Sequence, residues 1–144
     1  MGDFAKLNLK KEILEVLSRL KFDKSFDVQD KIVPLAMSGK NVVFTSKTGS
    51  GKTLAYLLGF LGKINKKQGT QMVVFVPTRE LCIQVCKEMK RICDLLDISV
   101  GMFYGGRDVP GDTRTLSRKN QIVVGTPGRL LLHVNEKKLK VGEV

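Results

Sequence analysis

Val42-Val43-Phe44-Thr45 is followed directly by Ser46-Lys47-Thr48-Gly49-Ser50-Gly51-Lys52-Thr53, and this stretch decides the fold. The short apolar run predicts a buried strand. The glycine-containing segment predicts a phosphate-binding loop, or P-loop, that opens a helix over residues 52–61. Gly49 and Gly51 would let the backbone curl, so that successive N–H groups and the helix N-terminus face a phosphate.

Two side chains of the loop suit the phosphates of ATP. Lys52 is expected to neutralise the β- and γ-phosphate oxygens, and Thr53 to supply a hydroxyl to Mg²⁺. Ser46 stands where the usual pattern begins with glycine, so the motif departs from the rule at one position. The alternative is a glycine-rich turn that only joins a strand to a helix. The strand, loop and helix context favours the P-loop, so residues 46–53 are predicted to bind nucleotide.

The rest of the chain alternates helix and strand patterns. Further strands are predicted over residues 72–76, 98–104 and 121–125. Helices are predicted over residues 9–20, 27–38, 52–61, 80–96, 112–118 and 128–135. Asn8 is a plausible N-cap for the first helix, Gly39 closes the second, and Pro34 predicts a kink or restart there. The order predicts an α/β domain with a three-layer, open, mostly parallel sheet flanked by helices, and ligands at the carboxyl ends of its strands.

The composition indicates which classes of binding partner and which cellular compartment to expect. The 144 residues suffice for one domain, and 25 Lys plus Arg against 14 Asp plus Glu give a net charge of +11. This charge favours nucleic acid first and an anionic membrane surface second. The absence of an apolar run of membrane-spanning length predicts an intracellular protein, cytoplasmic or nuclear. Cys82, Cys86 and Cys93 share one helical face and are expected to be core thiols rather than metal ligands.

Four short motifs carry a family resemblance: Thr-Gly-Ser-Gly-Lys-Thr at 48–53, Pro-Thr-Arg-Glu-Leu at 77–81, Gly-Gly at 105–106 and Thr-Pro-Gly-Arg at 126–129. In this order and at these strand ends, they resemble the DEAD-box RNA helicases. The resemblance implies that residues 1–144 are an incomplete, N-terminal part of a first RecA-like domain. Residues 1–30 would be the adenine-recognition segment, and residues 31–144 the P-loop core with the RNA-contacting motifs. The implied partners are RNA and the second RecA-like domain of a parent chain. No membrane partner is expected, and the sequence leaves the oligomeric state open, with a monomer favoured.

The resemblance also implies an adenine site. The family uses a segment of the form Gly-Phe-x-x-Pro-Thr-Pro-Ile-Gln, and the matching residues 21–29 keep Phe22 and Gln29. The Gln29 amide could pair with adenine N6 and N7 while Phe22 stacks on the base. The glycine and both prolines are absent, which predicts a less rigid loop and weaker adenine selectivity. The alternative for Gln29 is a solvated helix residue.

The resemblance assigns contacts with the RNA backbone to the later motifs. The predicted residues are Pro77, Thr78, Arg79, Gly105, Gly106, Thr126, Pro127, Gly128 and Arg129. Glycine N–H groups, threonine hydroxyls and arginines can hold phosphates but read no base, so binding should be independent of sequence. Thr126 and Pro127 would also cap and open a helix. Two expectations assign no role: His133 should face solvent, and the lysines at 10, 11, 63, 66, 67, 137 and 138 should be solvated charges.

Hydrolysis of ATP needs further groups: a Walker B carboxylate, a residue that orients water and usually an arginine finger. The 144 residues contain none of these in recognisable form. The family's Asp-Glu-Ala-Asp and Ser-Ala-Thr motifs would lie further along a parent chain, together with strands that pair with residues 42–45. We therefore expect the parent protein to unwind or remodel RNA with ATP, and these residues alone to bind without hydrolysis. The alternatives are a truncated nucleotide- or RNA-binding module and another P-loop enzyme, such as a small kinase.

Overall fold

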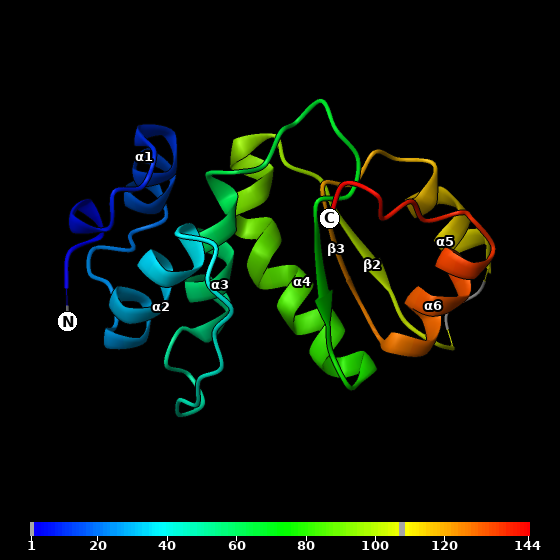
Figure 1. The fold of residues 1–144 in the computed structure, drawn as a ribbon, viewed down its shortest axis with the longest axis horizontal. Coiled ribbons are helices and arrows are strands. Elements are labelled where there is room, and N and C mark those ends of the chain that lie inside the picture. Colours follow the sequence, from blue (N-terminus) through cyan, green and yellow to red (C-terminus); the bar gives the residue numbers. More distant parts are fainter. Residues whose placement is uncertain (1, 107–108) are drawn as a thin grey trace. The chain divides into compact units, whose positions relative to one another are not determined.

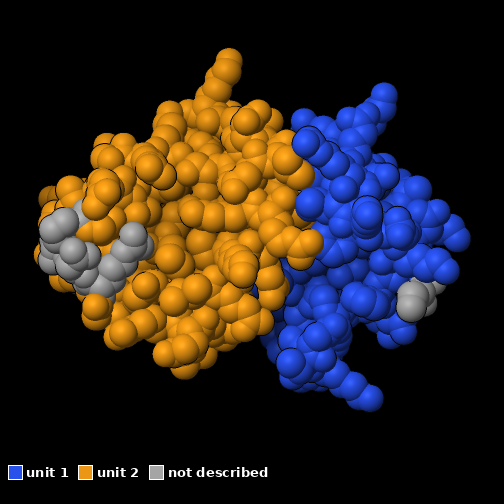
Figure 2. Space-filling view, turned by 180° about the vertical axis from the view of Figure 1, so that it is seen from behind, with its two compact units in different colours: residues 1–64 blue, residues 65–144 orange. Residues whose placement is uncertain are grey.

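The computed structural model describes residues 2–106 and 109–144. It divides into two compact units, residues 1–64 and residues 65–144, shown in different colours in Figure 2. Each unit is described below by itself. Within the described ranges, no helix is long and apolar enough to cross a membrane.

Unit 1, residues 1–64, is helical. Its elements are η1 (Phe4–Leu7), α1 (Lys11–Arg19), α2 (Asp27–Met37) and α3 (Lys52–Leu61). The buried apolar residues of α1 to α3 form its core, including Ile13, Leu17, Val33, Leu57 and Leu58. Helices α2 and α3 approach closely where Gly59 faces Ala36, since a Cβ on Gly59 would overlap the Ala36 side chain.

Unit 1 differs from the predictions at Asn8, and at Pro34 it excludes one of two alternatives. Asn8 does not cap α1; it ends η1 in the left-handed conformation at φ 53°, and Lys10 is the N-cap of α1. An asparagine tolerates that conformation, so it suits a turn as well as a cap. No restart occurs at Pro34, because α2 runs unbroken to Met37 with Val33 and Ala36 buried on either side of the proline. Gly39, at φ 78°, follows the helix as expected.

The predicted strand at residues 42–45 is not formed. This segment has no regular secondary structure, and Val43 is 99% exposed. A strand is stabilised by hydrogen bonds to a neighbour, and among residues 2–64 the sole β-pairing is the isolated bridge between Gly2 and Ser25. The apolar run therefore lacks a partner within its own unit.

Unit 2, residues 65–144, contains the sheet. The strands are β1 (Met72–Phe75), β2 (Val100–Phe103) and β3 (Ile122–Gly125), all parallel and ordered β1-β3-β2. The helices are α4 (Arg79–Cys93), which continues into η2 (Asp94–Leu96), α5 (Val109–Leu116) and α6 (Pro127–Asn135). Figure 1 shows α4 on one face of the sheet and α5 and α6 on the other. The three-layer, open parallel α/β fold is thus confirmed.

Both faces of this sheet are packed. On the α4 side, Cys82, Cys86 and Cys93 are buried, as predicted for core thiols. Burial raises the pKa of the Cys82 thiol to about 11 and that of the Cys93 thiol to about 12. On the other side, the buried cluster consists of Phe103, Val123, Leu130 and Leu139.

Candidate functional site

The backbone of the P-loop needs glycine at two positions. Gly49 and Gly51 have φ of 76° and 82°, in the left-handed region that disfavours a Cβ. Gly51 is also the N-cap of α3, and a Cβ there would overlap the side chains of Gln29 and Phe26. The Ala55 N–H bonds to Gly51 O at 3.0 Å, so the N–H groups of residues 52–54 precede the hydrogen-bond ladder of α3. An anion at this helix N-terminus would meet unshared donors and a favourable dipole.

The Lys52 side chain folds back over the loop. Its Nζ donates to Ser46 O at 2.8 Å and to Lys47 O at 2.6 Å. The loop is closed by a hydroxyl contact of 2.6 Å between Ser46 and Ser50. An ammonium bound to neutral carbonyls can exchange them for phosphate oxygens, which are stronger acceptors.

Gln29 joins the start of α2 to the P-loop. Its Oε1 accepts from the Phe26 N–H at 2.9 Å, and its Nε2 donates to Gly51 O at 3.2 Å. Gln29 is 1% exposed, so the solvated alternative is wrong. Each end of the amide retains one hydrogen-bonding position, since a primary amide carries two protons and two oxygen lone pairs. Phe22, the predicted stacking residue, is half-buried.

Phe26 was not predicted as a site residue. Its ring is 44% exposed, and it is near enough to Gly51 that a Cβ there would overlap it. The available signal was an aromatic residue three positions before Gln29, at the N-cap of α2.

The later motifs leave the sheet at one edge. Phe75, Gly125 and Phe103 are paired across β1, β3 and β2, so the three strands end at the same level. The motifs that begin at Pro77, Gly105 and Thr126 follow these ends (Figure 1). The expected gathering of these motifs at the carboxyl ends of the strands is confirmed.

Arg79 lies against the Gly-Gly turn. Gly106 has φ 81°, and a Cβ there would overlap the Arg79 guanidinium. The guanidinium carbon also lies 5.7 Å from the centroid of the Tyr104 ring, within cation–π range. Thr78 caps α4, with its Oγ1 accepting from the Leu81 N–H at 3.2 Å, and leaves its own O–H proton available.

Arg129 is held by a buried carboxylate. Thr126 is the N-cap of α6 and Pro127 its first residue, which agrees with their expected structural role. One turn later, Arg129 Nη1 lies 3.4 Å from Asp112 Oδ2, with the Arg129 side chain 13% exposed and Asp112 fully buried. Asp112, on α5, was not singled out in the sequence.

The prediction that His133 faces solvent was wrong. His133 is 3% exposed, its Nε2 lies 2.7 Å from Asp112 Oδ2, and its ring meets that of Phe103 edge-on at 5.2 Å. The physical reason is helical spacing: His133 follows Arg129 by four residues on α6, so both reach the same carboxylate. That spacing was the signal in the sequence.

Comparison with known proteins supports the resemblance to the DEAD-box RNA helicases. A family model described as DEAD/DEAH box helicase matches residues 26–144. The chain is 37% identical over its whole length to the ATP-dependent RNA helicase CshA of Listeria monocytogenes, and 36% identical over 98% of its length to the CshA of Bacillus subtilis. It spans 28% and 29% of the length of these two relatives.

Solved structures agree with this result. The whole chain superposes on 40% of a DEAD box protein from Methanococcus jannaschii with a TM-score of 0.90 at 34% identity. It superposes over 99% of its length on 36% of the RNA-helicase Prp28 of Chaetomium thermophilum, with a TM-score of 0.84 at 28% identity. The chain belongs to the DEAD-box family of ATP-dependent RNA helicases and corresponds to an N-terminal portion of the first RecA-like domain.

Proposed function

We propose that residues 46–53 bind the phosphates of ATP and that the strand-end motifs of unit 2 bind the RNA backbone. In this proposal, the parent protein couples ATP hydrolysis to unwinding or remodelling RNA, with a second RecA-like domain completing the site. The observation that carries it is the P-loop, where two left-handed glycines, a helix N-terminus and the Lys52 ammonium converge. A solved relative, Prp28, is described as bound to ADP, which supports nucleotide binding by this chain.

The residues of the loop fit ATP with Mg²⁺. The N–H groups at the start of α3 suit a phosphate, and Lys52 exchanges Ser46 O and Lys47 O for its oxygens. Thr53, in the first turn of α3, would hold Mg²⁺ through its hydroxyl. The metal, when bound, would neutralise charge on the phosphate oxygens.

The adenine contact is proposed for Gln29 and Phe22, with Phe26 added by the structure. Gln29 already spends one proton and one lone pair on Gly51 O and the Phe26 N–H. Its remaining proton and lone pair would meet adenine N7 and the N6 amino group. Because the same amide donates to the N-cap residue of α3, Gln29 would link base recognition to phosphate binding within unit 1.

RNA is proposed to lie along the carboxyl ends of β1, β3 and β2. Arg79, exposed beside the Gly105-Gly106 turn, is best placed to donate to a phosphate. Arg129 is mostly buried on Asp112, so we assign it one face toward phosphate and one toward the protein. These groups read no base edge, so affinity should be independent of sequence and fall with salt.

The experiment that tests the nucleotide site compares Lys52 with a lysine of unit 1 that lies outside the loop. Lys52→Ala should weaken binding of a fluorescent ATP analogue at least about tenfold, roughly 1.4 kcal/mol or more. Lys40→Ala removes the same charge from an exposed side chain outside residues 46–53 and should change the affinity by less than about twofold. Equal affinities of the two variants, with matching circular dichroism, would remove Lys52 from the site.

A further inference from the structure

A basic cleft lies at the amino-terminal edge of the sheet in unit 2. It lies where the loops before β1 and β3 meet the segment after α6, at the opposite end of the strands from the RNA motifs (Figure 1). Two cavities of about 240 and about 390 Å³ share Gly69, Thr70, Lys119 and Lys140 as lining. The cationic side chains of this basic cleft are Lys67, Arg118, Lys119, Lys138 and Lys140.

The floor of the basic cleft is fixed by satisfied polar groups. Thr70 Oγ1 donates to Asn120 O at 3.0 Å, and both residues are buried. Asn120 Nδ2 donates to Thr115 O at 2.8 Å and to Arg118 O at 3.2 Å. Lys119 Nζ bonds to Lys67 O at 2.5 Å, which places its ammonium between the two loops. The cations therefore project from a backbone that is already ordered.

An anion from the chain itself already occupies the basic cleft. Glu143 Oε2 accepts from the Gly69 N–H at 2.7 Å. A carboxylate oxygen on a backbone amide beside lysines makes the same contact as a phosphate oxygen. Outside the cavity linings, the Glu136 carboxylate lies 2.6 Å from Lys138 Nζ, and this contact lowers the pKa of Glu136. Cations still outnumber carboxylates around the cleft, so an incoming anion has charge to neutralise.

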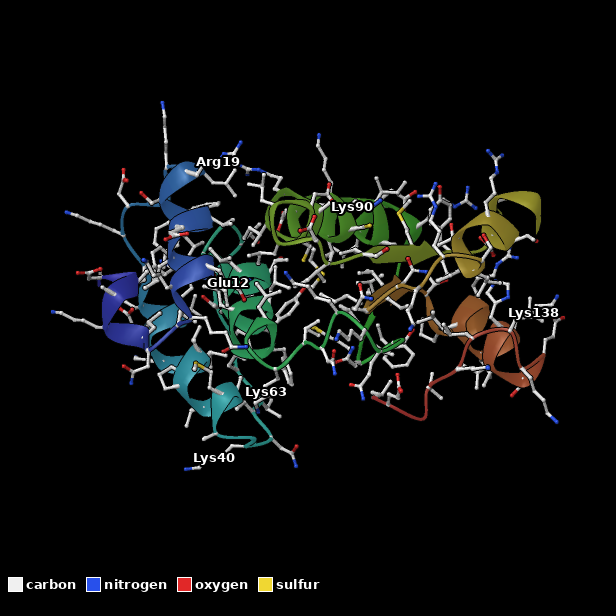
Figure 3. The ribbon with its side chains drawn as sticks, turned by 90° about the horizontal axis from the view of Figure 1, so that it is seen from above. Glu12, Arg19, Lys40, Lys63, Lys90 and Lys138 are labelled. Atoms are coloured by element: carbon white, nitrogen blue, oxygen red, sulfur yellow. The ribbon has the colours of Figure 1, made fainter. Side chains whose placement is uncertain are left out.

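We propose that the basic cleft is a second binding site for the phosphodiester backbone of an RNA strand. In this assignment, the Glu143 carboxylate takes the place of one phosphate until a strand displaces it. Two adjoining cavities with cations from three chain segments suit consecutive phosphates better than one isolated ion. Figure 3 looks onto this edge of the sheet and labels Lys138 beside α6 and Lys90 on α4.

The test measures binding of a fluorescein-labelled oligouridylate by anisotropy over a series of salt concentrations. The double variant Lys119→Gln/Lys140→Gln should weaken binding several-fold and flatten the slope of log K against log salt by roughly 0.7 for each lost phosphate contact. The control Lys87→Gln/Lys90→Gln removes the same charge from the exposed face of α4 and should have a clearly smaller effect. Equal losses in the two double variants would mean a diffuse charge effect and would overturn the proposal.

Glu143→Gln provides a test of opposite sign. Removing the competing carboxylate should strengthen binding several-fold, and the amide resonance of Gly69 should shift in the free protein and again with RNA. Unchanged RNA affinity in this variant contradicts the proposed competition.

Two further experiments are needed. One distinguishes an RNA strand from free phosphate as the ligand, and the other distinguishes the basic cleft from the strand-end motifs as the binding site. At matched ionic strength, inorganic phosphate should move the Gly69 resonance less than the oligonucleotide; equal shifts with equal affinity would indicate a free-anion site and defeat the strand assignment. In an Arg79→Ala background, the factor lost through Lys119→Gln/Lys140→Gln should persist even if binding at the strand-end motifs is gone. Its disappearance would mean that the basic cleft acts only through those motifs and holds no strand.

Discussion

Two apolar runs of this chain have similar composition and opposite fates. Val42-Val43-Phe44-Thr45 in unit 1 has no regular secondary structure, and Val43 is almost fully exposed. Ile122-Val123-Val124-Gly125 in unit 2 forms the central strand, paired on both sides and buried at every residue. Hydrophobicity and β-branching mark both runs as candidates for a strand, but a neighbour with free backbone groups decides which one becomes a strand.

The two runs should differ most in how much stability the protein loses when an aspartate is placed in each of them. Val123→Asp should cost more than about 4 kcal/mol of unfolding free energy, because it buries an unpaired carboxylate between two sheet neighbours. Val43→Asp should change it by less than about 0.5 kcal/mol, since that side chain already faces water. Urea unfolding followed by circular dichroism measures both. A large loss from Val43→Asp would mean that the segment is covered in solution.

A second test asks how much the buried polar cluster of unit 2 contributes. Asp112→Ala should destabilise by about 3 kcal/mol, because it leaves Arg129 and His133 without the carboxylate that both approach. Asp94→Ala removes an exposed carboxylate and serves as the control, with an expected change below about 0.5 kcal/mol. Similar values for the two variants would show that the cluster adds nothing to stability.

A third test compares the stability lost by alanine substitution at the two left-handed glycines of the P-loop in unit 1. Gly51→Ala should cost about 2 kcal/mol, because the new Cβ meets both a left-handed backbone and the Gln29 amide. Gly49→Ala faces open space and should cost about 1 kcal/mol from the backbone conformation alone. Thermal unfolding with and without ATP measures the difference. Equal losses of stability in the two variants would contradict the contact between Gln29 and Gly51.

Much of unit 2 could be predicted because its signals are local. The three strands, the helix that begins at Arg79 and the meeting of the motifs at the strand ends follow from periodicity and from the geometry of parallel sheets. The same local reasoning predicted a tight turn at Gly49 and Gly51 before a helix, and both glycines have positive φ at the start of α3.

Two of the errors have a common cause, which is that they depend on contacts between segments far apart in the sequence. Residues 42–45 have the sequence pattern of a strand, but that pattern does not show whether a neighbouring strand is present to pair with it. His133 reads as a polar residue on a surface helix until α5 brings Asp112 opposite it. The same limit applies to the solvated alternative for Gln29, which is excluded only once the N-cap of α2 and the start of α3 enclose its amide. Pairing across the fold cannot be read from spacing along one element.

The smallest expected effect concerns the thiols of α4, which the sequence correctly placed in the core. The pKa of Cys82 is about 11 and that of Cys93 about 12 in the folded protein, against 9.0 for an ordinary thiol, because burial disfavours the thiolate. Below pH 9 the thiols are protonated in both states, so their contribution to stability is fully present. Above pH 9 the unfolded chain releases these protons first, so stability falls as pH rises toward 11, by up to about 1.4 kcal/mol per pH unit and thiol. Urea midpoints measured across this range in the wild type and in Cys93→Ala isolate the effect, because the titration of lysines is common to both. The variant should lose stability with pH less steeply, and parallel curves would show that the Cys93 thiol ionises as readily in the folded protein as in the unfolded chain.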